Sequence, residues 1–282
     1  MKLNAMSRRD FVQLCGLSAA GIALSGSLAG CGSGSSGTAS SAKSGSSYTL
    51  VKSGKLTMIS NFYFPPFVSM NEKTGDYEGF DVDLYKAICE KLSLEPNILP
   101  TVQFDTIIPT IKQGGKADVS LGAITITDAR EQEIDFSDPY LDSNQSIVVR
   151  KDATATTAEQ LNADGMQIAV QGGTSGEEWA KENLPKATIV PLDDIIQALT
   201  GVQSNLYAAC ITDLPVSSYE IKIAYSDLMI PEGGEIPTGE QYGVVISKDQ
   251  PGLTKAINKA LADIQSDGTM DSLQQKWFGQ TL

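Results

Sequence analysis

The chain has 282 residues, 41% hydrophobic and 20% charged, which suits about two globular domains of ordinary size. Its formal net charge of −13 argues against nucleic-acid binding, because an acidic surface repels phosphate backbones. The absence of histidine excludes Ser-His-Asp and Cys-His catalysis and most catalytic zinc sites.

The first 30 residues are predicted to be a targeting signal. Arg8 and Arg9 precede a mildly apolar stretch, residues 11–29, and the surrounding residues match the twin-arginine pattern. This stretch is too polar and too rich in glycine to predict a membrane-spanning helix. It ends in a sequence that resembles the lipobox of bacterial lipoproteins, Leu28-Ala29-Gly30-Cys31.

The resemblance to a lipobox implies cleavage before Cys31 and lipidation of its thiol. The alternative is a plain signal peptide, residues 1–30, followed by a chance cysteine. Residues 31–47 are almost all Gly, Ser, Ala and Thr after the cysteine, which is typical of a flexible tether. We therefore expect the folded part to begin near Tyr48.

From Tyr48 onward, short apolar strands alternate with helices. Val82, Tyr85 and Ile88 fall on one helical face, and Asp81 stands in the first turn of that helix. The first run is predicted as a strand at 56–60, a helix at 81–92, a strand at 97–102, a short helix around 107–111 and a strand at 119–124.

A second run of the same kind follows. It is predicted as a strand at 146–150, a short helix capped by Thr157, a strand at 167–170, a helix at 175–183, a helix opened by Asp193 and Asp194 through 199, a strand at 208–211, a helix starting at Pro215, a strand at 242–247 and two helices ending around Trp277. Two such runs predict two α/β lobes. Ligands of such folds bind beyond the carboxyl ends of strands or between domains.

The cysteines do not indicate a metal site. Cys15 and Cys31 lie in the N-terminal segment, and no Cys-x-x-Cys spacing occurs. Cys89 and Cys210 are predicted to lie in different lobes. A disulfide between them and two buried free thiols are both open, and the pattern favours free thiols.

Several motifs follow one another in order over nearly all of residues 56–279. They are Phe64-Pro65-Pro66-Phe67, residues 79–84, 122–130, 135–140 and 171–175, Thr212-Asp213, Gln241-Tyr242-Gly243 and residues 276–279. This set resembles the polar amino-acid substrate-binding proteins of bacterial ABC importers, solute-binding family 3, of the glutamine-binding-protein-like kind and in lipoprotein form.

The resemblance implies an α/β, two-lobed periplasmic-binding-protein-like fold of type II. Each lobe would be a sheet covered by helices. Lobe 1 would comprise residues 48–139 plus 243–282, lobe 2 residues 145–237, and the hinge residues 140–144 and 238–242.

A free amino acid offers a carboxylate and an ammonium, and the resemblance assigns a partner to each. Arg130 would bind the carboxylate, because a guanidinium makes two parallel hydrogen bonds. Spacing alone favours the alternative that Arg130 is a surface arginine among acidic neighbours. Asp213 would meet the ammonium, although it could also cap the helix that starts at Leu214.

The resemblance also predicts the rest of the pocket. Phe64 and Phe104 would form its apolar walls, and the Gly-rich turn before residue 175 would present N–H groups to the carboxylate, or simply be a tight turn. Because Asn61 and Gln171 are uncharged, Arg130 and Asp213 would be the charged groups of the pocket. This favours a ligand with a neutral side chain, glutamine-like or cystine-like. The further ligand contacts predicted are Ala123, Ile124, Thr125, Thr174 and Ser175.

The expected function is an extracytoplasmic, lipid-anchored, monomeric binding subunit that delivers an L-amino acid to an ABC permease and its ATPase. No catalytic residue, cofactor or metal is expected. One rival is a dehydratase of cyclohexadienyl or arogenate substrates on the same fold, with Glu177, Glu178 or Glu240 as proton donor. The other is a ligand-sensing receptor domain.

Overall fold

The computed structural model describes residues 48–281. The predicted signal peptide, Cys31 and the tether therefore lie outside the described residues. Within residues 48–281, no helix has the length and apolar character needed to cross a membrane. The described residues belong to one compact unit.

The first lobe is built on a five-stranded sheet in the order β5-β1-β6-β14-β7. Its strands are β5 (Glu95–Ile98), β1 (Lys55–Ile59), β6 (Val119–Ser120), β14 (Val245–Ile246) and β7 (Asp135–Phe136). The strand β1 runs parallel to both of its neighbours, whereas β14 runs antiparallel to β6 and β7. The late part of the chain therefore returns to complete the first sheet.

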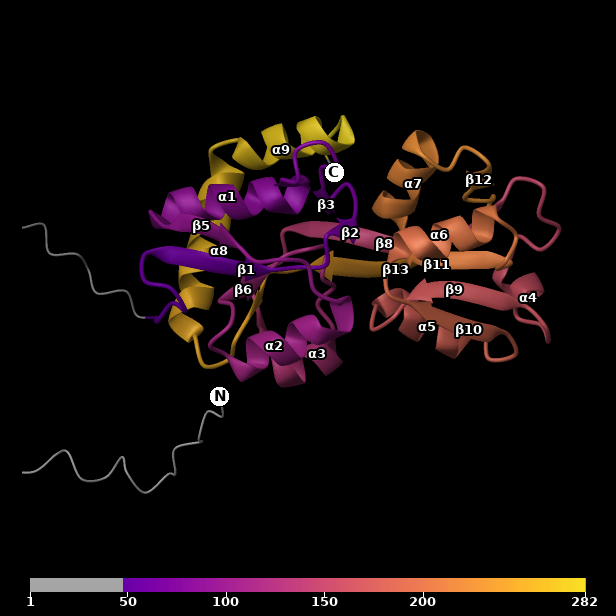
Figure 1. Ribbon diagram of the computed structural model, residues 1–282, viewed down its shortest axis with the longest axis horizontal. Coiled ribbons are helices and arrows are strands. Elements are labelled where there is room, and N and C mark those ends of the chain that lie inside the picture. Colours follow the sequence, from indigo (N-terminus) through magenta and orange to yellow (C-terminus); the bar gives the residue numbers. More distant parts are fainter. Residues whose placement is uncertain (1–47, 282) are drawn as a thin grey trace, which may run out of the picture. The chain divides into compact units, whose positions relative to one another are not determined.

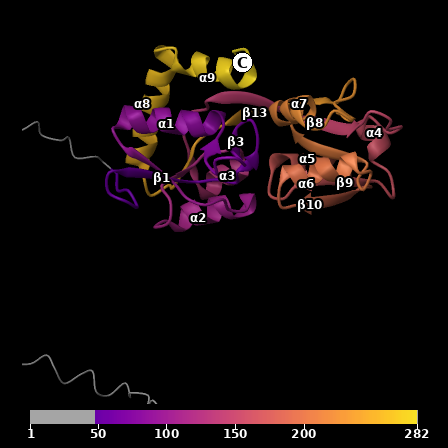
Figure 2. The same cartoon turned by 45° about the horizontal axis from the view of Figure 1, so that its top comes forward.

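Helices cover both faces of this sheet (Figures 1 and 2). They are α1 (Phe80–Leu92), α2 (Ile107–Gln113), α8 (Pro251–Ser266) and α9 (Thr269–Phe278), with a short 3-10 turn, Phe104–Thr106, before α2. A small antiparallel sheet of β2 (Tyr63–Phe64), β3 (Val68–Met70) and β4 (Tyr77–Glu78) precedes α1.

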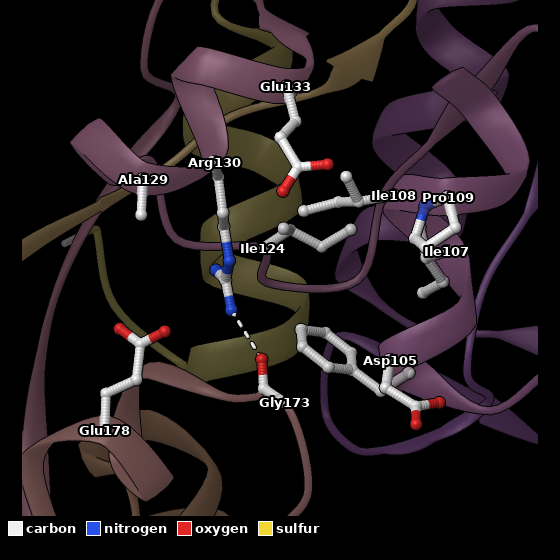
Figure 3. Close-up of a pocket in the computed structure, with 11 residues that line it drawn as sticks. Asp105, Ile107, Ile108, Pro109, Ile124, Ala129, Arg130, Glu133, Gly173 and Glu178 are labelled. Carbon is white, nitrogen blue, oxygen red and sulfur yellow. Dashed lines mark hydrogen bonds between the residues drawn. The ribbon is translucent and has the colours of Figure 1, made fainter. Parts of the chain in front are cut away.

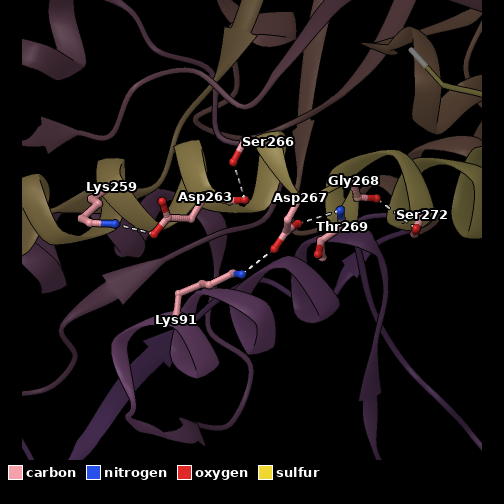
Figure 4. A network of polar contacts seen from close by, with 8 residues as sticks. All are labelled: Lys91, Lys259, Asp263, Ser266, Asp267, Gly268, Thr269 and Ser272. Carbon is pink, nitrogen blue, oxygen red and sulfur yellow. Dashed lines mark hydrogen bonds and ion pairs between the residues drawn. The ribbon is translucent and has the colours of Figure 1, made fainter.

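A polar network joins α1 to the turn between α8 and α9 (Figure 4). Lys91 pairs with Asp267, which also accepts the backbone N–H of Thr269 at 2.9 Å. These contacts hold the pKa of Asp267 below its ordinary range. Because the network is exposed, it orients the helices and adds little stability.

The second lobe is built on the strand order β10-β9-β11-β8-β12, with β13 paired to β8. Its strands are β8 (Leu141–Arg150), β9 (Gln167–Gln171), β10 (Thr188–Leu192), β11 (Ala209–Asp213), β12 (Leu228–Met229) and β13 (Glu235–Tyr242). Its helices are α4 (Ala158–Leu161), α5 (Ser175–Asn183), α6 (Ile195–Gln203) and α7 (Leu214–Ile223). The expected two-lobed α/β fold is confirmed.

Two strands cross between the lobes. Tyr242 pairs with Leu141, and Glu240 with Ser143, where β13 runs antiparallel to β8. After Tyr242 the chain enters β14 of the first sheet, and before Leu141 it leaves β7. This pairing supports hinge segments at 140–144 and 238–242, and we retain those boundaries and the lobe limits as a proposal.

Helix starts follow the local sequence signals closely. Thr157 forms a complete capping box with Gln160, and Asp194 accepts the N–H of Gln197 at 2.8 Å. The helix predicted at 175–183 has those bounds, with Thr174 as its N-cap. Pro215 stands in the first turn of α7 as expected.

Four strand predictions were wrong in extent. The strand predicted at 146–150 begins earlier, at Leu141. The strand predicted at 119–124 ends at Ser120, because Gly122 and Ala123 turn the chain with φ of 148° and 53°. The strand predicted at 97–102 occupies Glu95–Ile98 instead. The strand predicted at 242–247 is divided between the end of β13 and β14, because the chain passes there from one sheet to the other.

The two cysteines in the described chain, Cys89 and Cys210, are buried free thiols, which confirms the favoured reading. Burial raises the pKa of Cys89 to about 11 and raises that of Cys210 as well. Neither thiol is suited to react, because the thiolate is the nucleophile.

Candidate functional site

Arg130 lies on α3 (Asp128–Glu133), a one-turn helix that Thr127 caps by accepting the Arg130 N–H at 3.2 Å. Its Nη1 donates to the Thr125 carbonyl at 2.7 Å. Its Nη2 donates at 2.9 Å to the carbonyl of Gly173, which belongs to the second lobe (Figure 3). The side chain is buried, so Arg130 is not a surface arginine.

The guanidinium has an apolar neighbour on one side. It lies 5.5 Å from the centre of the Phe104 ring. Both residues line a cavity of about 270 Å³ whose apolar wall includes Ile107, Ile108 and Ile124 (Figure 3). Loss of hydration lowers the pKa of Arg130. The nearby carboxylates act in the opposite direction, and they belong to Glu178, Asp213 and Glu240.

The turn between β9 and α5 is both a tight turn and a helix start. Gly173 has φ of 79° and lies so close to Asp105 that an added Cβ would stand 3.1 Å from the Asp105 Cβ. Thr174 accepts the Glu177 N–H at 3.2 Å, and Glu177 accepts the Gly173 N–H at 2.7 Å. Glu177, considered above as a proton donor, therefore stabilises the helix start and pairs with Lys181.

Asp213 ends β11 and is buried. Its Oδ1 accepts from Gln145 Nε2 at 2.8 Å, and its Oδ2 accepts from the Tyr242 hydroxyl. Although Asp213 stands at the N-cap of α7, its side chain makes no capping hydrogen bond. Burial raises the pKa of Asp213, and the neighbouring Glu240 carboxylate raises it further.

Gln145 was not recognised from the sequence. It is fully buried on β8, and its Nε2 donates to both Asp213 and Glu240, to the latter at 2.9 Å. Thr125 and Ser175 also reach Glu240, each at 3.2 Å. Gln145 stands two residues before the apolar run 147–149, and this position was the only sequence signal for it.

Asn61 and Gln171 meet across the lobes. Gln171 Nε2 donates to Asn61 Oδ1 at 3.1 Å, and Asn61 Nδ2 donates to the Val102 carbonyl at 2.9 Å. Within residues 48–281, the buried Gln171 Oε1 has no hydrogen-bond partner. This part of the site is therefore polar, uncharged and rich in acceptors.

The remaining predicted site residues are not all brought together. Phe104 packs beside Ile124 in one hydrophobic cluster, whereas Phe64 belongs to another. Ala123 lies directly before Ile124 and its N–H points to Asp81. Phe64 and Phe104 therefore pack into different parts of the core, and their joint contact with a ligand stays a prediction.

No group of metal-binding side chains occurs in the described part of the chain. The site instead joins a buried guanidinium, two neighbouring carboxylates and several amides and hydroxyls between two lobes. Such a set is complementary to a small zwitterion.

Residues 56–280 match the family described as bacterial extracellular solute-binding proteins, family 3. The ABC transporter glutamine-binding protein GlnH of Bacillus subtilis is 31% identical over 255 residues, or 89% of this chain and 92% of that protein. The L-cystine-binding protein TcyJ of Escherichia coli is 30% identical over 218 residues, or 77% and 79%.

Solved structures agree with these matches. An ancestral arginine-binding protein bound to glutamine has a TM-score of 0.74 and 35% identity, covering 80% of this chain and 99% of that one. The ancestral amino acid-binding protein AncCDT-1, a precursor of cyclohexadienyl dehydratase, has a TM-score of 0.73 and 36% identity, covering 80% and 96%.

Proposed function

Because the chain belongs to family 3 of the bacterial extracellular solute-binding proteins, we propose that it captures an L-amino acid between its lobes and delivers it to an ABC permease. The similar proteins GlnH and TcyJ are named for glutamine and cystine. ATP hydrolysis would take place on other subunits of the importer.

The observation that carries this proposal is the placement of Arg130 and Asp213. Arg130 rises from the first lobe to the Gly173 carbonyl of the second, and Asp213 ends a strand of the second lobe. Arg130 would bind the ligand carboxylate and Asp213 the ammonium, so that one zwitterion links both lobes. Closure of two lobes over a ligand is a common transition of hinged proteins.

The proposed ligand is polar and neutral, glutamine-like or cystine-like. The Asn61–Gln171 contact supports this choice, since amides cannot neutralise a cationic side chain as a carboxylate does. Gln171 Oε1 is a buried acceptor that a ligand N–H could satisfy. We propose that Thr125, Thr174 and Ser175 complete the polar contacts, and that Phe64, Phe104, Ala123 and Ile124 complete the apolar ones.

The chain is a binding protein and not an enzyme. The members of its family and its named relatives are likewise binding proteins. Of the three proton donors considered for a dehydratase, Glu177 is held at the start of α5 and paired with Lys181, whereas Glu178 and Glu240 lie near Arg130. A turnover assay with prephenate and arogenate checks this conclusion.

We further propose that the protein is monomeric and held at the extracytoplasmic face of the cell membrane by a lipid on Cys31. The lipobox-like sequence before Cys31 motivates this step. Cys31→Ala should release the protein from the membrane fraction, while Cys15→Ala should not. A Cys31→Ala protein that still sediments with membranes would contradict the anchor.

The ligand is tested with protein expressed from residue 32 onward, stripped of bound solutes by unfolding and refolding. Thermal melting is recorded against each L-amino acid, including glutamine, cystine and arginine. A ligand at about 1,000 times its dissociation constant should stabilise the protein by roughly 4 kcal/mol. A flat response from folded protein would overturn the proposal.

Arg130→Ala supplies the second test. It should weaken binding of the ligand at least about 100-fold, because a charged hydrogen-bonded pair is lost in a buried site. Arg150→Ala is the matched control, since Arg150 pairs with Asp152 away from the site. Equal affinity of Arg130→Ala and Arg150→Ala would contradict the role of Arg130.

A further inference from the structure

Glu240 extends from the crossing strand β13 into the space between the lobes. One carboxylate oxygen, Oε2, accepts from Gln145 Nε2 at 2.9 Å and from Thr125 Oγ1 and Ser175 Oγ, each at 3.2 Å. Thr125 belongs to the first lobe and Ser175 starts α5 of the second. Glu240 thus connects the hinge strand to both lobes.

Glu240 is also a close neighbour of Asp213. Gln145 Nε2 donates to both carboxylates, at 2.8 Å to Asp213 and at 2.9 Å to Glu240. None of the ion pairs within residues 48–281 includes either acid. Two carboxylates that share one neutral amide repel one another, and a cation between them would relieve that repulsion.

We propose that Glu240 is a second acidic partner of the ligand's α-ammonium, acting together with Asp213, and that Gln145 sets their spacing. This inference rests on the proposed amino-acid-binding function. An ammonium has three N–H donors that point in diverging directions, so a single carboxylate leaves at least one of them to another acceptor. Asp213 and Glu240 supply two charged acceptors, and the hydroxyls of Thr125 and Ser175 stand beside them.

The position of Glu240 connects ammonium binding with lobe closure. In a form with the lobes apart, Thr125 and Ser175 would separate, and Glu240 could not contact both. In this structure all three side chains meet, and Asp213 and Glu240 are near enough to Arg130 to oppose the lowering of its pKa by burial. The carboxylate end and the ammonium end of a zwitterion are therefore both engaged only after closure.

The test compares L-glutamine with glutaramate, the same molecule without its amino group, by calorimetry on wild-type protein and Glu240→Gln. The substitution keeps the size of the side chain and removes its charge. We expect at least about tenfold weaker binding of L-glutamine, which is about 1.4 kcal/mol. Glutaramate binding should not weaken, because it has no ammonium to lose a partner.

Two further variants separate charge from structure. Glu240→Asp retains the charge and should bind L-glutamine more tightly than Glu240→Gln. Glu235→Gln is the control on the same strand, because Glu235 is exposed and contacts Asn144 rather than the site. Circular dichroism of each variant checks that the fold is retained.

Three results would overturn the inference. Unchanged L-glutamine binding by Glu240→Gln would exclude a role in recognition, and equal weakening for both probes would make Glu240 structural. Tighter binding of L-glutamine by Glu240→Gln would mean that Glu240 competes with the ligand carboxylate for Arg130. Failure of wild-type protein to bind any amino acid would instead refute the proposed function itself.

Discussion

The Asp81 carboxylate accepts the backbone N–H of Ala123 at 2.7 Å, joining the start of α1 to the loop that leads into the site. The same oxygen accepts from the Tyr140 hydroxyl at 2.7 Å. Ala123 has φ of 53°, a conformation that costs a residue with a Cβ roughly 1–2 kcal/mol. The buried Asp81 therefore holds a strained turn two residues before Thr125.

Asp81→Ala should destabilise the protein by about 2–4 kcal/mol, because the Ala123 N–H and the Tyr140 hydroxyl would lose a buried partner. It should also weaken ligand binding, since the turn positions Thr125. Urea unfolding measures the first effect and calorimetry the second. Loss of stability with unaltered affinity would show that the turn is held by other contacts.

Thr127→Ala should destabilise the protein by about 1 kcal/mol, because the N-cap of α3 is lost. The affinity for the ligand should fall as well, since Arg130 lies on that single turn. Thr157→Ala removes a comparable cap from α4, which carries no proposed site residue. Thr127→Ala and Thr157→Ala should lose similar stability, so the comparison depends on their affinities for the ligand. Equal affinities of the two variants would argue that Thr127 does not position Arg130.

Gly79→Ala should be among the most destabilising single substitutions, costing more than about 3 kcal/mol. Gly79 precedes α1 with φ of 136°, and an added Cβ would stand 2.0 Å from the Phe67 carbonyl oxygen. Gly75→Ala is the control, because Gly75 also has positive φ but open space around it. Melting temperatures of the two variants should differ clearly, and similar values would refute the steric argument.

Stability should fall as the pH rises from about 4 to about 7. Burial raises the pKa of Asp81 and of Glu220 to about 7 in the folded protein, against about 4 in an unfolded chain. The folded state therefore binds protons more tightly within this window, so stability is greatest at its acid end and is lost towards pH 7.

Glu220→Gln should reduce that decline, because it removes one of the groups that titrates. Urea unfolding at pH 5, 6 and 7 measures the slope of stability against pH. Glu72→Gln, an exposed substitution, serves as the control. A slope that is the same in Glu220→Gln and wild type would show that Glu220 does not carry the effect.

Local signals in the sequence predicted helices better than strands. Thr157 and Asp194 each mark a helix start where the structure has one, because a cap and the N–H it accepts lie three residues apart. The strand predicted at 119–124 failed for the opposite reason. Its apolar residues continue past Ser120, but the chain is turned at Ala123 with the support of a carboxylate from a distant helix.

The sequence by itself indicated two α/β lobes through the periodicity of its elements, and its ordered motifs identified the family. The proposed roles of Arg130 and Asp213 are what that resemblance implies. Only the tertiary structure decided what surrounds them. Gln145 and Glu240 are 95 residues apart, yet they meet beside Asp213. The sequence could not place them there, because their contact depends on how β11 and β13, far apart in the chain from β8, pair with it in one sheet.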